Sequence, residues 1–193
     1  MRFEELQITG AVRVLIEASR DARGFFARTF CTREFEANGL PVGVVQASIS
    51  YNECCGTVRG LHFQWPPSRE DKFVRCIRGR LLDILLDLRP DSPTYLQHCA
   101  IALDEESRDA VFIPQGVAHG FQTLVDHTEV LYQMTDFYAP DLSAGVRWND
   151  PVFGIRWPLP PALISQRDAN YADFDSAWHE AEVARRHGQL DTA

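Results

Sequence analysis

The sequence lacks an excess of positive charge, a long apolar run and a signal-peptide pattern. Its formal net charge is −8, which argues against general nucleic-acid binding, because the phosphate backbone needs a basic face. No stretch reaches the length of a membrane span, and Met1 is followed by RFEELQITGAVRVL, which contains acidic residues and no signal-like apolar core. We therefore expect a cytoplasmic protein that binds neither nucleic acid nor a membrane.

Cysteine pairs with metal-binding spacing are absent as well. The five cysteines stand at positions 31, 54, 55, 76 and 99 without CxxC spacing, and Cys54 and Cys55 are too close for an ordinary disulfide. We interpret them as reduced thiols, which fits the cytoplasm. The chain also has no Gly-x-Gly-x-x-Gly loop for a dinucleotide. No redox cofactor is expected.

What the chain does contain is a series of short segments rich in strand-forming residues. With 193 residues, 45% of them apolar, it can form one domain with a real core. Strands are predicted at residues 72–79, 80–89, 110–114 and 128–134, with a hairpin turning at Arg78–Arg80. Helices are predicted at 32–40, with Thr32 as N-cap, and at 173–188, ending at Gly188 before a frayed tail. This pattern predicts a barrel or sandwich.

Two motifs resemble those of the cupin jelly roll. Pro114, Gly116 and His119 match the second cupin motif, and the first motif would run from His62 to Gly79. A cupin metal site usually needs three imidazoles and a carboxylate, but Gln64 stands where a second histidine is expected. Glu70 follows Pro66–Pro67, which must bend the strand away. The motifs predict the fold and argue against a metal.

His62 also lies among other ionisable residues. Arg59 precedes it by three positions and Lys72 follows it by ten, while Asp83 and Asp87 lie in an apolar strand. An unpaired carboxylate would be costly there. A lone histidine is more often a satisfied residue of a barrel wall, so spacing alone leaves both readings open. Ionisable groups gathered around a cavity favour a functional site.

Longer segments resemble the dTDP-4-dehydrorhamnose 3,5-epimerase family. The matching segments, in family order, are DARGFFARTF, RGLHFQWPP, DKFVRCIRGRLLDILLDLRPDSPTY, FIPQGVAHGF, TEVLYQMTDFYAP, VRWNDPVFGIRWP and ISQRD. The resemblance implies an all-β, cupin-type jelly-roll barrel with a few short peripheral helices. It also implies an isomerase acting on a nucleotide-diphospho-4-keto-6-deoxy sugar through an enolate, with no cofactor.

The resemblance assigns catalytic roles to matching positions. His62 is the expected base, Asp168 the carboxylate paired with it, and Tyr132 the acid on the opposite sugar face. From sequence alone, Asp168 reads as a turn or N-cap residue and Tyr132 as a barrel tyrosine. Lys72 is expected to stabilise the developing charge on O4, and His119 to contact substrate. We expect Asp83 to orient Lys72 or His119.

Substrate binding and assembly follow from the same resemblance. Family positions that contact the nucleotide or its diphosphate are matched by Arg23, Arg59, Gln46, Arg167 and, as the base-stacking aromatic, Tyr138. In the family, the N-terminal segment crosses to a neighbouring subunit. We therefore expect a homodimer in which residues 1–40 take part, with Arg23 and Phe26 contributed in trans.

Three positions depart from the family pattern. Arg28 replaces a glutamate, Gln46-Ala47-Ser48 replaces Gln-Asp-Asn, and Ser143 replaces a second glutamate. All three lie on the nucleotide side, where exchanging an acid for a base inverts hydrogen-bond polarity. We keep Arg28, Ser48 and Ser143 as substrate-binding candidates and expect a base or sugar preference that differs from the dTDP-hexose pattern. Inversion at C3 only, a metal-dependent cupin enzyme and a non-catalytic sugar-nucleotide binding module remain alternatives.

Overall fold

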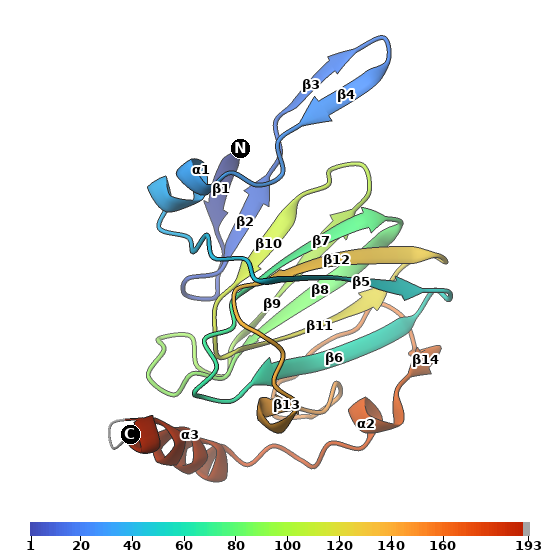
Figure 1. The fold of residues 1–193 in the computed structure, drawn as a ribbon. Coiled ribbons are helices and arrows are strands. Elements are labelled where there is room, and N and C mark those ends of the chain that lie inside the picture. Colours follow the sequence, from blue (N-terminus) through green and yellow to red (C-terminus); the bar gives the residue numbers. More distant parts are fainter. Residues whose placement is uncertain (191–193) are drawn as a thin grey trace.

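The computed structural model describes the fold of residues 1–190 and the side chains of residues 1–188. Two antiparallel sheets are stacked on one another, as the all-β jelly-roll prediction requires (Figure 1). The first sheet contains, in spatial order, β1 (Arg2–Glu5), β2 (Val12–Leu15), β10 (Ala110–Ile113), β7 (Lys72–Arg78), β12 (Thr128–Met134) and β5 (Gln46–Asn52). The second contains β13 (Ser143–Gly145), β6 (Thr57–Gln64), β11 (Val117–Thr123), β8 (Arg80–Asp87) and β9 (His98–Asp104), with β14 (Leu163–Ile164) paired to β6.

The core lies between the two sheets. Alternate residues of each strand point inward, and Val74, Leu85, Phe121 and Val130 are fully or almost fully buried there. The outer face of the second sheet is also apolar, because α3 (Ser176–Leu190) and the preceding segment cover it. This two-sided burial explains why β8 carries apolar residues on both faces, as at Ile84, Leu85 and Leu86.

The predicted hairpin at Arg78–Arg80 is wrong. β7 and β8 are the expected strands, but β7 pairs with β10 and β12 in the first sheet, whereas β8 pairs with β9 and β11 in the second. Gly79 has a φ of +77° and forms a corner at which the chain changes sheets. A glycine between two strand-like runs marks a sharp bend, and the local sequence does not reveal which sheet the second strand joins.

The two predicted helices are present with different ends. α1 spans Thr32–Ala37, and Cys31 rather than Thr32 occupies the N-cap position, without a side-chain hydrogen bond. The terminal helix α3 begins at Ser176 and continues through Gly188 to Leu190, so the predicted stop at Gly188 is wrong. The remainder of the predicted frayed tail, residues 191–193, lies outside the described residues. The assignment of residues 1–193 to one domain stays a prediction.

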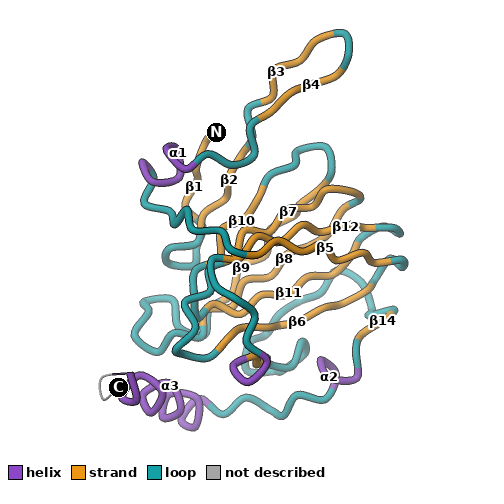
Figure 2. The backbone as a smooth tube through the Cα atoms, in the orientation of Figure 1, coloured by secondary structure: helices purple, strands orange, loops and turns teal. Residues whose placement is uncertain are grey.

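One hairpin stands apart from the sheets. β3 (Ala18–Asp21) pairs with β4 (Gly24–Ala27), and Figures 1 and 2 show this arm extending beyond the rest of the molecule. Two short helical turns, η1 (Pro140–Leu142) and α2 (Gln166–Ala169), lie beside the second sheet. Among the described residues no helix is long and apolar enough to cross a membrane, and all five cysteines are free thiols.

Candidate active site

A polar strand borders the interior of the barrel on one side. β5 is an edge strand whose register pairs Ser48 with Tyr132 and Gln46 with Met134. Residues that are directly opposite on paired strands share a sheet face, and Tyr132 packs against the core between the sheets. The inward-facing residues of β5 are therefore polar, namely Gln46, Ser48, Ser50 and Asn52. The strands beside it present mainly apolar side chains to the interior.

Across from β5, an irregularity in β6 brings two predicted site residues to one face. His62 pairs with His119 and Arg59 pairs with Phe121, so three steps along β6 match two steps along β11. This count is that of a β-bulge. Because His119 and Phe121 lie on the same face of β11, Arg59 and His62 both point into the barrel. Gly60, between them, has a φ of +116°.

His62 and Asp168 form the predicted pair. His62 Nε2 donates to Asp168 Oδ1 over 2.7 Å, and the backbone N–H of Gly60 donates to Asp168 Oδ2 over 3.1 Å. Burial acts to raise the pKa of Asp168, but the hydrogen bonds from His62, Gly60 and Ser165 outweigh it and hold this pKa below its ordinary value. The His62 side chain is 41% exposed and that of Asp168 only 5%. The imidazole is thus open to a ligand while its partner is not.

Asp168 reaches this position because α2 begins just before it. Ser165 caps α2 by accepting a hydrogen bond from the Asp168 N–H over 3.1 Å. The local sequence suggested a turn or N-cap role for Asp168, but the N-cap of α2 is Ser165. The carboxylate is left free to turn toward β6 and meet a histidine 106 positions earlier in the chain.

A second histidine–carboxylate pair lies deeper. His119 Nε2 and Asp83 Oδ1 are hydrogen-bonded over 2.6 Å, so of its two expected partners Asp83 contacts His119. Burial raises the pKa of Asp83 despite the opposing effect of His119. Asp87 is not part of this site, because it binds Arg89, Ser92 and Thr94.

Tyr132 lies edge-on to His119, with 5.9 Å between the ring centroids. Burial raises the pKa of Tyr132, the charge of Asp83 raises it further, and Arg59 partly opposes them. The phenol is therefore protonated across the neutral pH range. A protonated phenol is the form that an acid catalyst requires.

Lys72 has a carboxylate partner that sequence reasoning set aside. Its Nζ lies 2.8 Å from Glu70 Oε2, and both side chains are largely buried, at 15% and 8% exposure. Lys72 pairs in register with Met134, two residues from Tyr132 on the same face of β12. Glu70, which the sequence analysis set aside as a metal ligand, is instead the ion-pair partner of Lys72.

The nucleotide-side residues are connected to one another. Gln46 Oε1 accepts from the backbone N–H of Tyr138 over 2.7 Å, and Gln64 Oε1 accepts from that of Ala139 over 2.9 Å. Gln64, which replaces a cupin metal ligand, thus holds the loop that carries Tyr138.

Two arginines are also held by hydrogen bonds to predicted or neighbouring residues. Arg167 donates to Ser143 Oγ over 3.0 Å. Arg59 Nε donates to Asn52 Oδ1 over 2.7 Å. Arg167 of α2 is therefore bonded to β13, and Arg59 of β6 is bonded to β5.

The predicted residues of the N-terminal segment are not part of this network. Arg23 pairs with Asp21 at the tip of the arm, with 89% of its side chain exposed. Phe26 is 82% exposed, and Arg28 binds Glu34 rather than any cleft residue. Within one chain these three candidates have no described contact with His62 or Asp168.

The donor set does not fit a metal ion. The described residues contain no group of three or more histidine, cysteine, aspartate or glutamate side chains that could hold a metal. The arrangement instead offers a paired imidazole, a protonated phenol and a lysine, which are groups that move protons and stabilise an oxyanion.

Sequence reasoning missed several supporting residues. Tyr171 lies edge-on to His62, with 6.5 Å between ring centroids, and Arg167 lies over its ring. The only sequence signal was its position, three residues after Asp168. Asn52, which fixes Arg59, gave no signal, because its role depends on strand register.

Comparisons with known proteins agree with this geometry. The family model described as dTDP-4-dehydrorhamnose 3,5-epimerase matches residues 5–176. The dTDP-4-dehydrorhamnose 3,5-epimerase of Methanothermobacter thermautotrophicus is 40% identical over 173 residues, covering 88% of this chain and 92% of its own. The dTDP-4-dehydrorhamnose 3-epimerase of Streptomyces niveus is 37% identical over 169 residues, covering 87% and 81%.

A solved structure agrees in fold over most of the chain. The Bacillus anthracis dTDP-4-dehydrorhamnose 3,5-epimerase, crystallised with TDP and PPi bound, superposes with a TM-score of 0.87 at 35% identity. The match covers 90% of this chain and 99% of that one. Sequence, fold and the order of the motifs lead to one conclusion: the chain belongs to the dTDP-4-dehydrorhamnose 3,5-epimerase family.

Proposed function

We propose that this isomerase inverts C3, C5 or both carbons of a nucleotide-diphospho-4-keto-6-deoxy sugar by removing and returning a proton. The observation that carries the proposal is the His62–Asp168 pair, whose imidazole is open to the cleft while the carboxylate is buried. The 4-keto group acidifies the hydrogens on its neighbouring carbons. A base of near-neutral pKa can then remove one of them and leave an enolate.

In this mechanism His62 takes the proton from the sugar carbon. The Asp168 carboxylate fixes the ring orientation and stabilises the imidazolium that forms. The lowered pKa of Asp168 keeps it ionised at neutral pH, as this role needs. The electrons of the broken C–H bond move into the enolate, and negative charge develops on O4.

Lys72 and Tyr132 complete the proposed cycle. Lys72, held by Glu70, supplies a fixed positive charge for O4. Tyr132 donates its phenolic proton to the opposite face of the carbon, which inverts the centre. His119, oriented by Asp83, contacts the substrate beside Tyr132. The proton taken by His62 then returns to solvent, and Tyr132 is reprotonated.

The remaining candidates are assigned to the nucleotide diphosphate. Guanidinium groups suit phosphate oxygens, so we assign Arg59, Arg167 and Arg23 to the diphosphate and Tyr138 to the base. Gln46, Ser48 and Ser143 line the same cleft, and the exchange of acid for base at Arg28 would alter the preference for the base or sugar.

We further propose a homodimer that works in the cytoplasm, where free cysteines persist. The arm would carry Arg23 and Phe26 to the cleft of the neighbouring subunit. Two exposed surfaces support this assembly: Phe26 on the arm, and Ile49 and Tyr51 on the outer face of β5. Exposed apolar surface of this kind marks an interface.

Solvent exchange tests the reaction and separates its two forms. In D₂O with dTDP-4-keto-6-deoxyglucose, deuterium should enter at C3 and C5 for a double epimerase and at C3 only for a single one, as followed by NMR. Relatives of both kinds are similarly identical to this chain, at 40% and 37%. Tight binding of the nucleotide sugar without any exchange would instead favour the non-catalytic module.

The acid is tested separately from the base. Tyr132→Phe should permit deuterium exchange but lower the yield of the inverted sugar, because the phenolic proton is lost while His62 remains. An unchanged yield of the epimer would contradict the role of Tyr132. Comparing dTDP, GDP and CDP forms of the substrate tests the altered preference, and dTDP-4-keto-6-deoxyglucose as the best substrate would contradict it.

A further inference from the structure

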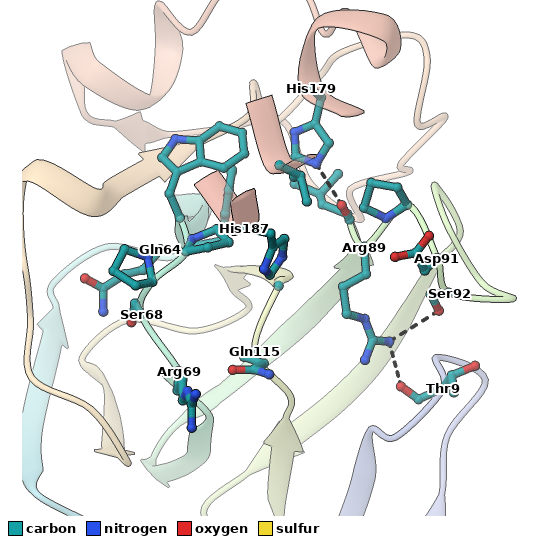
Figure 3. Close-up of a pocket in the computed structure, with 18 of the residues that line it drawn as sticks. Thr9, Gln64, Ser68, Arg69, Arg89, Asp91, Ser92, Gln115, His179 and His187 are labelled. Carbon is teal, nitrogen blue, oxygen red and sulfur yellow. Dashed lines mark hydrogen bonds between the residues drawn. The ribbon is translucent and has the colours of Figure 1, made fainter. Parts of the chain in front are cut away.

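A cavity of about 660 Å³ opens at the end of the barrel beside α3 (Figure 3). The segment 63–69, the loop 88–93, the turn at 115–116 and α3 form its walls. His62, Tyr132, Lys72 and Asp168 are not among its lining residues. One wall, formed by His179, Val183 and His187 of α3, lies beyond residue 176, where the match to the family model ends. The cavity therefore contains none of the proposed catalytic residues, although Gln64, which holds the loop carrying Tyr138, also lines it.

One part of this cavity is apolar and rigid. Its apolar lining consists of Phe63, Trp65, Pro66, Pro67, Leu88, Pro90, Pro93 and Val183. Proline rings and aromatic side chains lose little conformational freedom when a ligand covers them. His179, which closes the wall at α3, is fixed by donating Nε2 to the Leu88 carbonyl over 2.7 Å. A volume of this size and such a lining are typical of small-molecule sites.

Three N–H-bearing side chains that line the cavity are exposed to solvent and have no protein partner among the described residues. Arg69, Gln115 and His187 come from three separate segments (Figure 3). Their side chains make no hydrogen bond or ion pair with the residues that the structure describes, whereas the backbone N–H of Arg69 is used by Asp136. Unpaired donors around an apolar surface suit a ligand with an acceptor group.

The charged residues Arg89 and Asp91, on the 88–93 loop, indicate which charge the acceptor group of a ligand would carry. Arg89 is neutralised by Asp87 at 2.7 Å and also donates to the Thr9 carbonyl, so its guanidinium is occupied. Asp91 lines the loop side of the cavity, away from Arg69 (Figure 3). An anionic group is therefore accommodated beside Arg69 and repelled from the Asp91 side.

We propose that this cavity is a binding site for a small organic anion with a flat apolar body, such as an aromatic carboxylate. The flat body lies against the proline and aromatic wall. The anionic group accepts hydrogen bonds from Arg69 and Gln115, while His187 lines the α3 side of the cavity. The site is independent of the proposed epimerase chemistry.

Calorimetric titration with two matched probes tests the proposal. 2-Naphthoate and (2-naphthyl)methylammonium share the flat body and differ in charge. For a ligand of this size we expect 2-naphthoate to bind with a Kd of about 1 mM or tighter, and the ammonium probe at least about tenfold more weakly. Equal binding of the two probes, or no saturable binding of 2-naphthoate, would overturn the proposal.

Two variants test whether 2-naphthoate binds in this cavity. Arg69→Gln keeps the backbone bond to Asp136 and should weaken 2-naphthoate binding about tenfold, without changing the rate of sugar epimerisation measured in the absence of probe. Val183→Trp should block the cavity from the α3 side. The proposal fails if either variant binds the probe as the parent chain does, or if dTDP displaces it, because the probe would then occupy the proposed active site.

Discussion

Two regions of the molecule carry similar side chains that differ in exposure and in hydrogen-bond partners. One is the β6 wall, which we define as residues 57–64 with their bonded partners, and the other is the β3–β4 arm. On the wall, His62 has Asp168 and Arg59 has Asn52 as hydrogen-bond partners. On the arm, Phe26 is 82% exposed, and the guanidinium of Arg23 is bonded only to Asp21, two positions earlier. The wall residues thus find their hydrogen-bond partners within one chain, whereas Phe26 and most of Arg23 on the arm remain exposed.

Under the proposed function, the wall carries the catalytic groups and the arm carries binding contacts. Catalytic groups must be held within a fraction of an ångström, and supporting residues of the same chain provide that rigidity. A binding contact to a distant phosphate or base tolerates a partner that arrives on assembly. We therefore expect wall variants to change the rate of proton transfer, and arm variants to change substrate affinity and assembly.

The largest effect is expected on the wall. His62→Ala should lower the rate of deuterium exchange at both carbons by about 10³-fold, because general base catalysis contributes roughly 10²–10⁴. NMR of the substrate in D₂O measures the loss. His98→Ala, which changes a histidine of β9 outside the cleft, is the matched control. A His62→Ala protein that exchanges as fast as this control would remove the proposed base.

The arm should give the next largest effect. Replacing both Arg23 and Phe26 with alanine should lower kcat/KM by about a hundredfold, because a diphosphate contact and an aromatic anchor are lost together.

Co-expressing the arm variant with the His62→Ala chain tests whether the arm acts in trans. A mixed dimer would have one cleft with an intact His62 and an intact arm, so roughly a quarter of all clefts should be active in a random mixture. Activity no higher than the sum of the two separate variants would mean that the arm serves its own chain.

A smaller effect is expected from Glu70, which supports the proposed catalytic residue Lys72. Glu70→Gln should lower kcat about tenfold with little change in KM, because Lys72 loses the charge that positions it. Glu106→Gln, at an exposed position on the loop after β9, is the control in steady-state assays. An equal change in both variants would exclude a specific role for Glu70.

The smallest effect concerns stability. Because the folded-state pKa of Asp168 lies below its ordinary value, its stabilising contribution is present above about pH 4 and is lost as the pH falls through the folded pKa. Asp168→Asn should lower the Tm at pH 7 by about 2–4 °C, and this difference should shrink toward acid pH.

The arm supplies the control for that measurement. Arg23 also lowers the pKa of Asp21, but this pair is exposed to solvent, where ion pairs contribute little. Asp21→Asn should therefore leave the Tm nearly unchanged across the same pH series. A pH-independent loss of Tm in Asp168→Asn would mean that its ionisation does not stabilise the fold.

The sequence predicted the β-rich architecture because turn residues separate short strand-forming segments. It also predicted His62, His119 and Asp168 as site candidates, although the place of Asp168 rested on the family resemblance and not on spacing. Asn52, Glu70 and Tyr171 were missed because their contacts depend on register, on a proline bend and on a helical turn. The corner at Gly79 was misread because a glycine corner and a hairpin turn have the same local sequence.

The bulge at Gly60 has a consequence for the number of residues in β6. In a regular strand, side chains two positions apart point to the same face. The three-position spacing from Arg59 to His62 therefore contains one residue more than their shared direction requires. The inserted residue instead provides a spare backbone amide, which holds the outer oxygen of Asp168. A Cβ at this position would lie 2.6 Å from the Gly120 Cα atom. A shortened β6 would therefore keep both side chains in the cleft and still lose part of what holds the carboxylate against the base.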